Sequence, residues 1–312
     1  MCTSPLFTVC TPTYNRGELL PRVYASLRMQ TFTNFEWLVV DDGSVDGTGD
    51  LVSRWRVESP FPIRYYWQEN SGKHMAHNVC VRNARGELFV MIDSDDWLVA
   101  TALERLRWEW DQIPDKQRYS GVCCLFQYED GETVGDCFPR NQMESDAVDL
   151  RYNLGIHGDK IGCTRTDILR MFPFPDYLGR QLVPESLVWN RISQEYHLRC
   201  VNAVIGVKEY QTDGLTDLSG LNSFRNPLAY YLYNLEILNG KLPIRLTSAA
   251  RIAVSLAKCS ILARKSPTCV RHLLYLTMTV AAMPVGGILV LRDWWRATRP
   301  SRDLSRSRLG VR

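Results

Sequence analysis

The part of the chain that most constrains its fold is residues 88–97, where an apolar run ends abruptly in three carboxylates. Its first five residues have the composition of a buried strand, and Asp93, Asp95 and Asp96 follow directly. At the carboxyl edge of a parallel sheet these side chains would line a ligand crevice, and carboxylates there suit Mg²⁺ or Mn²⁺. A second interpretation stays open, because Asp-Ser-Asp also caps helices and residues 100–111 have a helical pattern.

Strand and helix signals alternate through the first half of the chain, which predicts an α/β fold on a mainly parallel sheet, sandwiched by helices. The predicted strands cover residues 6–10, 35–40, 63–68, 88–92, 121–128 and 200–210. The predicted helices cover residues 15–29, 46–55, 75–84, 100–111 and 184–196. Asn15 and Glu18 have the spacing of a capping box. Polar residues follow three successive strand ends, so we expect them to meet one ligand.

The 312 residues, 45% of them apolar and 23% charged, describe a globular protein of one large domain with appendages or of two domains. We predict a first domain of residues 1–220 and a helical, basic region of residues 221–312. The ten cysteines form no C-x-x-C pair, and reduced structural thiols are the simplest interpretation. The N-terminus does not resemble a secretory signal, so we expect the first domain in the cytosol.

Charge is unevenly distributed along the chain. Residues 241–312 hold 14 Lys and Arg against two acids, whereas the first 240 residues hold 23 bases and 32 acids. Helices are predicted over residues 227–238 and 245–265, and in the second of these Arg251 and Lys258 lie on one face. This pattern predicts a basic amphipathic helix on an anionic membrane surface.

Residues 273–291 carry no charge and would reach about 29 Å as one straight helix, just enough to cross a bilayer. Pro284 and two glycines interrupt them, and a single crossing would export the arginine-rich tail against the positive-inside tendency. A monotopic or re-entrant hairpin at the inner face of the cell membrane, anchored by Trp294 and Trp295, is the favoured prediction. A buried helix packed on the first domain or in an oligomer is the alternative.

Several ordered segments together resemble family 2 of the glycosyltransferases, which use the GT-A fold. The matching segments are residues 10–15, 39–44, 70–74, 84–87 and 93–96. The resemblance covers about residues 4–215 and implies transfer of a hexose-type sugar from a nucleotide diphosphate donor, usually UDP-linked, with inversion at the anomeric carbon. The acceptor would be a saccharide or a polyprenyl-linked precursor of a surface polysaccharide.

The resemblance also implies roles for individual residues at the donor. Pro12 and Tyr14 would flank the base, and Asp42 would accept the imide N–H of uracil. The nucleotide and its diphosphate would be contacted further by Asn70, Lys73, Asp93 and Ser94. Asp95, with Asp93, would hold the Mn²⁺ or Mg²⁺ that neutralises the departing diphosphate.

Inverting transfer also needs a carboxylate that takes the proton of the acceptor hydroxyl. Many relatives have an Asp after a Glu at this point, whereas this chain has Glu185 followed by Ser186, so Glu185 is the predicted base. Asp159 is a second candidate. His77 stands where many relatives have an arginine near the diphosphate, and with His74 it has the alternative of an ordinary surface position on a helix.

Other classes of protein fit less well. A nonenzymatic nucleotide-sugar sensor or scaffold is the alternative that the departure at Ser186 leaves open. A dehydrogenase is disfavoured because the first strand does not lead into a glycine-rich turn. The basic tail contains no recognisable nucleic-acid-binding module, so no nucleic-acid partner is predicted.

Overall fold

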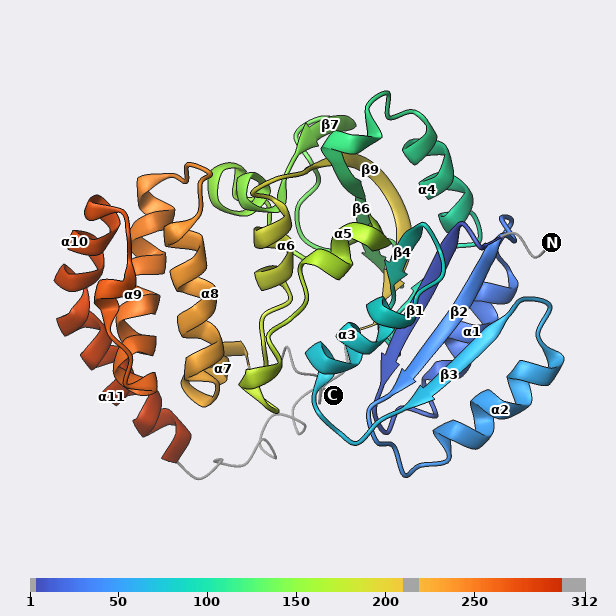
Figure 1. Cartoon of the computed structure of the whole chain (residues 1–312), viewed down its shortest axis with the longest axis horizontal. Coiled ribbons are helices and arrows are strands. Elements are labelled where there is room, and N and C mark those ends of the chain that lie inside the picture. Colours follow the sequence, from blue (N-terminus) through green and yellow to red (C-terminus); the bar gives the residue numbers. More distant parts are fainter. Residues whose placement is uncertain (1–3, 210–218, 299–312) are drawn as a thin grey trace, which may run out of the picture. The chain divides into compact units, whose positions relative to one another are not determined.

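A computed structural model describes residues 4–209 and 219–298 of the chain. They form two compact units (Figure 1). Unit 1 holds residues 4–209 and 240–245, and unit 2 holds residues 219–239 and 246–298. Unit 1 is an α/β domain and the described part of unit 2 consists of helices and their connections, so the predicted fold class is confirmed. The functional boundary at residue 220 stays a prediction.

Unit 1 is built on a nine-stranded sheet of order β3-β2-β1-β4-β8-β6-β9-β5, with β7 paired to β9. The strands are β1 (Phe7–Thr13), β2 (Phe35–Asp41), β3 (Ile63–Trp67), β4 (Leu88–Met91), β5 (Trp97–Leu98), β6 (Tyr119–Tyr128), β7 (Gln142–Ser145), β8 (Lys160–Arg165) and β9 (His197–Lys208). The first four strands in the order are parallel, as predicted. Beyond β4 the sheet is mixed, because β8 runs antiparallel to β4 and β6, while β5 and β7 run antiparallel to β9.

Helices cover both faces of this sheet (Figure 1). The helices of unit 1 are α1 (Leu20–Arg28), α2 (Thr48–Glu58), α3 (Lys73–Asn83), α4 (Ala102–Asp111), α5 (Thr166–Met171) and α6 (Ser186–Ile192). Apolar side chains of α1, α2 and α4 form one core with alternate residues of β1 and β2, including Phe7 and Trp37. The other face of β1 and β2 meets α3, where Ala76 is fully buried. Burial on both faces explains the nearly continuous apolar sequence of β2.

Cys10 of β1 and Cys80 of α3 form a disulfide. Their Cα atoms lie 6.2 Å apart, within the range that a disulfide bridges. The prediction of reduced cysteines is therefore wrong for this pair, because local spacing gives no sign of a contact between residues 70 positions apart. The other cysteines in the described part of the chain have free thiols, and most of them are buried.

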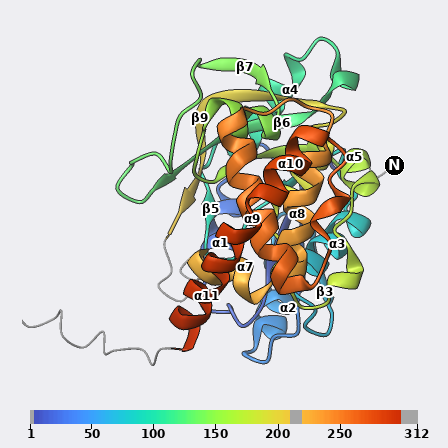
Figure 2. The ribbon, with the colours of Figure 1, turned by 90° about the vertical axis from the view of Figure 1, so that its left-hand side faces the viewer.

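Unit 2 is a small helical bundle centred on α9. Its helices are α7 (Ser219–Arg225), α8 (Pro227–Asn239), α9 (Leu246–Ala263), α10 (Leu273–Ala281) and α11 (Met283–Thr298). Figure 2 shows α9 beside α8, α10 and α11, and each of them packs against it. At Gly286 of α11 the two backbones approach so closely that a Cβ atom would lie 2.8 Å from the backbone nitrogen of Lys258. Glycine at this position therefore permits the contact between α9 and α11.

Lys258 is buried in unit 2, where its ammonium lies 2.5 Å from Asp293 and 2.8 Å from the hydroxyl of Ser223. The prediction that Lys258 lies on an outward basic face is therefore wrong, because a carboxylate 35 residues away pairs with it inside the bundle. By length and composition α9 is long and apolar enough to cross a membrane, although 44% of it is buried. The pair α10 and α11 passes the same test only together, with a bend of 50°.

A buried carboxylate on the inner side of α4, that of Glu109, is held by two arginines. Glu109 has no exposed surface, and its carboxylate accepts hydrogen bonds from Arg105 at 2.8 Å and from Arg199 of β9 at 2.7 Å. On the same helix, Arg107 and Asp111 form a second ion pair at 2.9 Å, and this pair is exposed to solvent. Burial, not distance, therefore distinguishes the two pairs.

We expect Arg199→Leu to lower the free energy of unfolding by about 1–3 kcal/mol, because it removes one partner from a buried carboxylate. Arg107→Leu, the matched control on α4, should cost less than about 0.5 kcal/mol because its pair is exposed. Urea unfolding followed by tryptophan fluorescence measures both. Equal losses in the two variants would contradict a structural role for the buried network.

Candidate active site

Polar segments meet at one edge of unit 1 because three strands are in parallel register. β1 pairs with β2 as far as Thr13 and Asp41, and with β4 as far as Cys10 and Met91. β3 joins them, with Trp67 opposite Asp41. The segments that leave these strands therefore start at the same carboxyl edge, where open α/β sheets bind ligands.

The loops after β1 and β2 are tied together by hydrogen bonds. The backbone N–H of Asn15 donates to the hydroxyl of Ser44 at 2.8 Å, and its side-chain oxygen accepts from the backbone N–H of Val45 at 2.9 Å. Asn15 has a φ of 49°, and α1 begins only at Leu20. The predicted capping box with Glu18 is therefore wrong, because Asn15 is engaged by the neighbouring loop instead.

The residues expected around the base and ribose differ in accessibility. The ring of Tyr14 is 48% exposed, whereas Pro12 is buried within β1 and Ser94 is buried after β4. Asn70 lies against Gly43, whose φ of 92° and proximity to the Asn70 backbone nitrogen leave no room for a Cβ atom. The structure thus brings these residues to one edge, with Tyr14 as the accessible aromatic side chain among them.

Asp42 organises the loop that precedes α3. Its buried carboxylate accepts hydrogen bonds from the side chain of Gln68 at 2.6 Å and from the backbone N–H groups of Ser71 and Gly72, both at 2.8 Å. A carboxylate has about four acceptor positions, so these bonds leave about one for a ligand. No local pattern indicated Gln68, which reaches Asp42 because β2 and β3 are neighbours.

Three carboxylates converge after β4. One oxygen each of Asp93, Asp95 and Asp96 lies within 4.8 Å of the others. One oxygen of Asp96 is buried and has no hydrogen-bond partner among the described residues. An oxygen-only, strongly negative donor set suits a hard divalent cation such as Mg²⁺ or Mn²⁺, so the residues present fit the predicted metal.

Lys73 connects this cluster to the candidate base. Lys73 is the first residue of α3, and Glu185 immediately precedes α6. The ammonium of Lys73 lies 2.7 Å from Asp93 and 2.6 Å from Glu185. Burial alone would lower the pKa of Lys73, but the charges of the two carboxylates outweigh it and hold the pKa well above its ordinary value. Lys73 therefore stays charged and places Glu185 beside the aspartate cluster.

Lys208, at the end of β9, is a charged contact that the sequence analysis missed. Its ammonium lies 3.3 Å from Asp96 and 2.9 Å from Asp159. Burial raises the pKa of Asp96 to about 7 in spite of the attraction to Lys208. A basic residue at the end of an otherwise apolar strand was the available signal. Its partners depend on distant strand pairings, because β5 pairs with β9 beside Asp96 and β8 pairs with β6 beside Asp159. Asp159 thus lies beside the cluster.

His77 and His74 are both buried, so the alternative of ordinary surface-helix positions is wrong. The ring of His77 lies edge-on to Phe174, at 5.0 Å between centroids, and close to Phe89 and Trp189. Neither ring nitrogen of His77 has a hydrogen-bond partner among the described residues. Burial, reinforced by the charge of Lys73, lowers the pKa of His77 to about 3, so the ring is neutral. Because His77 is neutral, the positive charge nearest to the expected diphosphate position is that of Lys73, not of His77.

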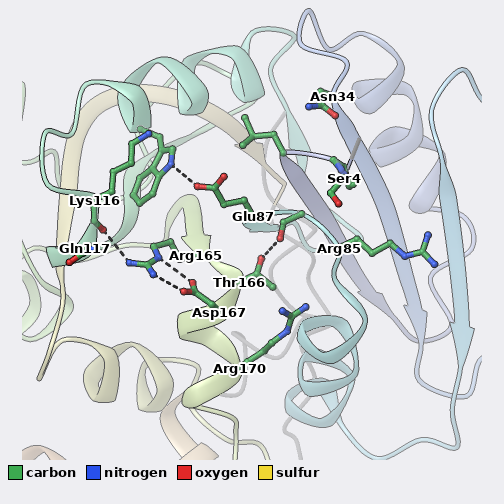
Figure 3. A pocket seen from close by; sticks show the side chains of 14 residues that line it. Ser4, Asn34, Arg85, Glu87, Lys116, Gln117, Arg165, Thr166, Asp167 and Arg170 are labelled. Carbon is green, nitrogen blue, oxygen red and sulfur yellow. Dashed lines mark hydrogen bonds and ion pairs between the residues drawn. The ribbon is translucent and has the colours of Figure 1, made fainter. Parts of the chain in front are cut away.

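A separate cavity of about 630 Å³ lies at the opposite edge of the sheet, beside the residues that precede β1 and β4 (Figure 3). Several of its polar groups bond to one another or to nearby backbone: Arg165 pairs with Asp167 at 2.6 Å, and Arg170 donates to a backbone carbonyl at 2.6 Å. The indole of Trp110 donates to Glu87. This cavity contains none of the predicted donor or metal residues, so it is distinct from the candidate active site.

Comparison with known proteins matches residues 8–158 to the family described as Glycosyl transferase family 2. The chain is 29% identical over 130 residues to glycosyltransferase GlyG of Streptococcus pneumoniae, covering 41% of this chain and 42% of that protein. It is 26% identical over 162 residues to the putative teichuronic acid biosynthesis glycosyltransferase TuaG of Bacillus subtilis, covering 51% and 60%. Four of the curated relatives are matched over only 15% to 60% of their own length.

Solved structures show the same fold. The described chain resembles residues 1–349 of S. aureus TarS in complex with UDP-GlcNAc, with a TM-score of 0.62 and 19% identity over 95% of this chain and 93% of that one. It also resembles the mannosyltransferase PcManGT of Pyrobaculum calidifontis in complex with GDP-Man and Mn²⁺, with a TM-score of 0.57 and 20% identity over 95% and 88%. At these identities the similarity establishes the fold, which is of the GT-A type.

His77 predicts a specific sensitivity to acid. Its pKa is lowered in the folded protein, so the unfolded chain binds one proton more between about pH 6.5 and pH 3. Stability from this group is present above pH 6.5 and is lost, by about 1.4 kcal/mol per pH unit, as the pH falls through that range. We expect His77→Phe to flatten this acid limb in urea unfolding, whereas His272→Phe, at an exposed position, should not. An unchanged slope in His77→Phe would contradict the burial of a neutral ring.

Proposed function

Because residues 8–158 match glycosyl transferase family 2, we propose that the protein is an inverting, metal-dependent glycosyltransferase of the hexosyltransferase type. It would move a sugar from a UDP-linked donor to a saccharide or polyprenyl-linked acceptor during synthesis of a cell-surface glycan. One observation carries the proposal, namely the convergence of Asp93, Asp95 and Asp96 with Lys73 and Glu185 at the carboxyl edge of the sheet. The bound UDP-GlcNAc and GDP-Man of the two solved structures support a nucleotide-sugar donor.

The donor would lie across the ends of β1, β2 and β4. Tyr14 offers an exposed ring for stacking on the base, and the acceptor position left on Asp42 suits the imide N–H of uracil. Asn70 and Ser94 complete the nucleotide contacts, while Pro12 supports the loop from within β1. A base without an imide N–H would leave Asp42 without this bond, which favours uridine nucleotides.

Asp95 and Asp93 would hold the Mn²⁺ or Mg²⁺. The cation supplies neutralisation of the charge that develops on the departing diphosphate. Asp96 is assigned a supporting role, because Lys208 already lies 3.3 Å from its carboxylate and most of the side chain is buried. The manganese in the solved mannosyltransferase supports a divalent cation on this fold without deciding between the two ions.

Glu185 would accept the proton of the acceptor hydroxyl. In the described structure its carboxylate lies 2.6 Å from the ammonium of Lys73, so this ion pair occupies an oxygen that would otherwise accept the proton. A diphosphate beside Lys73 would compete for that ammonium and free Glu185. Lys73 therefore has two roles in the proposal, one toward the diphosphate and one in keeping the base inactive until the donor is present. Asp159, which lies 2.9 Å from the ammonium of Lys208, would contact the acceptor.

Binding of a polyprenyl-linked acceptor would require the protein to work at the inner face of the cell membrane. The basic composition of residues 241–312 supports attachment to anionic lipid, and we propose a peripheral or monotopic attachment through this region. The polar face expected on α9 contributes less than the sequence suggested, because Lys258 is buried.

Metal and donor binding can be tested together by thermal stabilisation. We expect UDP-sugars to raise the unfolding temperature by several degrees only when Mn²⁺ or Mg²⁺ is present, since ligand at 100 times its Kd adds about 2.7 kcal/mol. Asp95→Asn should abolish this shift, and Asp111→Asn, an exposed aspartate on α4, should keep it. Stabilisation of equal size without metal would overturn the proposed metal dependence.

The role of Glu185 separates an enzyme from a nonenzymatic sensor or scaffold. We expect Glu185→Gln to lower the rate of sugar transfer by about 100-fold or more, because the acceptor hydroxyl loses its proton acceptor, while donor binding is retained or tightened, because the amide no longer competes for Lys73. UDP release in the presence of a panel of saccharide and polyprenyl-linked acceptors measures turnover, and thermal stabilisation measures donor binding. Glu195→Gln, an exposed glutamate just after α6, is the matched control.

Two results would contradict this assignment. Full turnover in Glu185→Gln would exclude it as the base and direct attention to Asp159. Donor binding by the unaltered protein with no UDP release for any acceptor would favour the sensor or scaffold instead.

A further inference from the structure

Helices α10 and α11 present large apolar side chains to their surroundings. These side chains, which we call the apolar stripe, are exposed over 46–75% of their surface and are Leu273, Leu274, Val280, Val285, Ile288, Leu291, Trp294 and Trp295. On α11 they recur every three or four residues and so lie along one side of the helix. Because the exposed side of a helix in a soluble domain is normally polar, an apolar stripe marks an interaction surface.

The opposite side of α11 is held inside unit 2. Gly286 touches the backbone of α9, and Asp293 is fully buried between the ammonium of Lys258 and the guanidinium of Arg292. Rotation of α11 to hide the apolar stripe would separate Asp293 from Lys258 and leave two buried charges unpaired, which is strongly unfavourable. The apolar stripe is therefore fixed on the outside of the bundle.

The charges around the apolar stripe favour one occupant. Arg271 precedes α10, and Arg292 and Arg296 lie near the end of α11, all with exposed side chains. Between residues 271 and 298 the single acidic residue is Asp293, which is buried and paired. A second copy of this chain on the same surface would bring arginines against arginines, which disfavours a symmetric dimer. Arginines at both ends and two tryptophans at one end suit the headgroup region of an anionic bilayer.

The shape of the helix pair favours an in-plane position over a crossing. α10 has 9 residues and α11 has 16, and the two are bent by 50°. Even straight, the uncharged residues 273–291 would just reach the thickness of the hydrocarbon core, about 30 Å, and the bend shortens them.

We infer that α10 and α11 lie in the plane of an anionic lipid surface, with the apolar stripe inserted at the level of the headgroups and Arg271, Arg292 and Arg296 on the lipid phosphates. α9 supports this pair from within the bundle and does not cross the bilayer. The inference rests on the membrane association proposed above and names the surface that makes it.

Vesicle co-sedimentation of the full chain tests the inference. We expect the protein to bind vesicles of phosphatidylcholine with phosphatidylglycerol, to bind vesicles of phosphatidylcholine alone more weakly, and to lose binding as salt is added. The double variant Ile288→Asp with Leu291→Asp should bind at least about tenfold more weakly, because two apolar side chains leave the interface. Val57→Asp, which places the same charge on an exposed apolar position of α2, should bind normally. Bound protein should be released by alkaline carbonate, as expected for a helix pair that does not cross.

Failure of the unaltered chain to bind anionic vesicles would overturn the inference, as would equal binding by the double variant or resistance to carbonate extraction. A second copy as the true occupant would show as a dimer in solution that the double variant disrupts. Donor stabilisation in the presence of Mn²⁺ is measured on the same samples. A protein that binds vesicles but is not stabilised by the donor would count against the proposed transferase and support the docking surface. A protein that is stabilised by the donor but does not bind vesicles would count against the docking surface and leave the proposed transferase supported.

Discussion

The candidate active site depends on the parallel register of β1 with β2 and β4. A slip of one residue would turn every side chain of β1 to the other face of the sheet, taking Cys10 away from α3 and Phe7 out of the core. The same register fixes where the strands end, and hence where the polar loops begin. Asp42 can collect the backbone N–H groups of Ser71 and Gly72 because β2 and β3 finish together. A single strand register therefore determines both how the core packs and where the polar loops of the candidate site begin.

Ion pairs hold the carboxylates of the candidate site together. Five carboxylates gather there against two ammonium groups, and each lysine bridges carboxylates from different segments: Lys73 joins Asp93 to Glu185, and Lys208 joins Asp96 to Asp159. The excess of negative charge favours recruitment of a cation, and a cation in turn favours a diphosphate. The two lysines thus partly neutralise the carboxylates, and in the proposed function the charges of metal and donor would replace part of these ion pairs.

Local sequence patterns predicted six of the nine strands, most helices and the edge at which Asp42, Asp93 and Asp95 would lie, but not β5, β7 or β8. These features follow from periodicity and from strand ends, which short segments encode. The misses share a different origin. The disulfide of Cys10, the ion pair of Lys258 and the contact of Asn15 with Val45 each involve a partner at least 30 positions away, and periodicity carries no information on which distant residue lies opposite. His77 was misjudged for the same reason, because the aromatic rings that bury it come from β4 and from the segments around α6.

The uneven distribution of charge would give the two parts of the chain different behaviour at the proposed membrane surface. The acidic first 240 residues are repelled by an anionic surface, whereas residues 241–312 are attracted to it, with about 1 kcal/mol for each Lys or Arg near the lipid. This attraction reaches about 8–10 Å at physiological salt, so it orients the protein before any apolar contact forms. Burial of Lys258 would remove one of these charges from the proposed membrane contact, but its ion pair with Asp293 holds α11 on α9, and the exposure of the apolar stripe depends on that ion pair. The proposed membrane contact would therefore lose a small electrostatic contribution at Lys258. The free energy gained by burying several large apolar side chains of the apolar stripe in lipid would be larger than this loss.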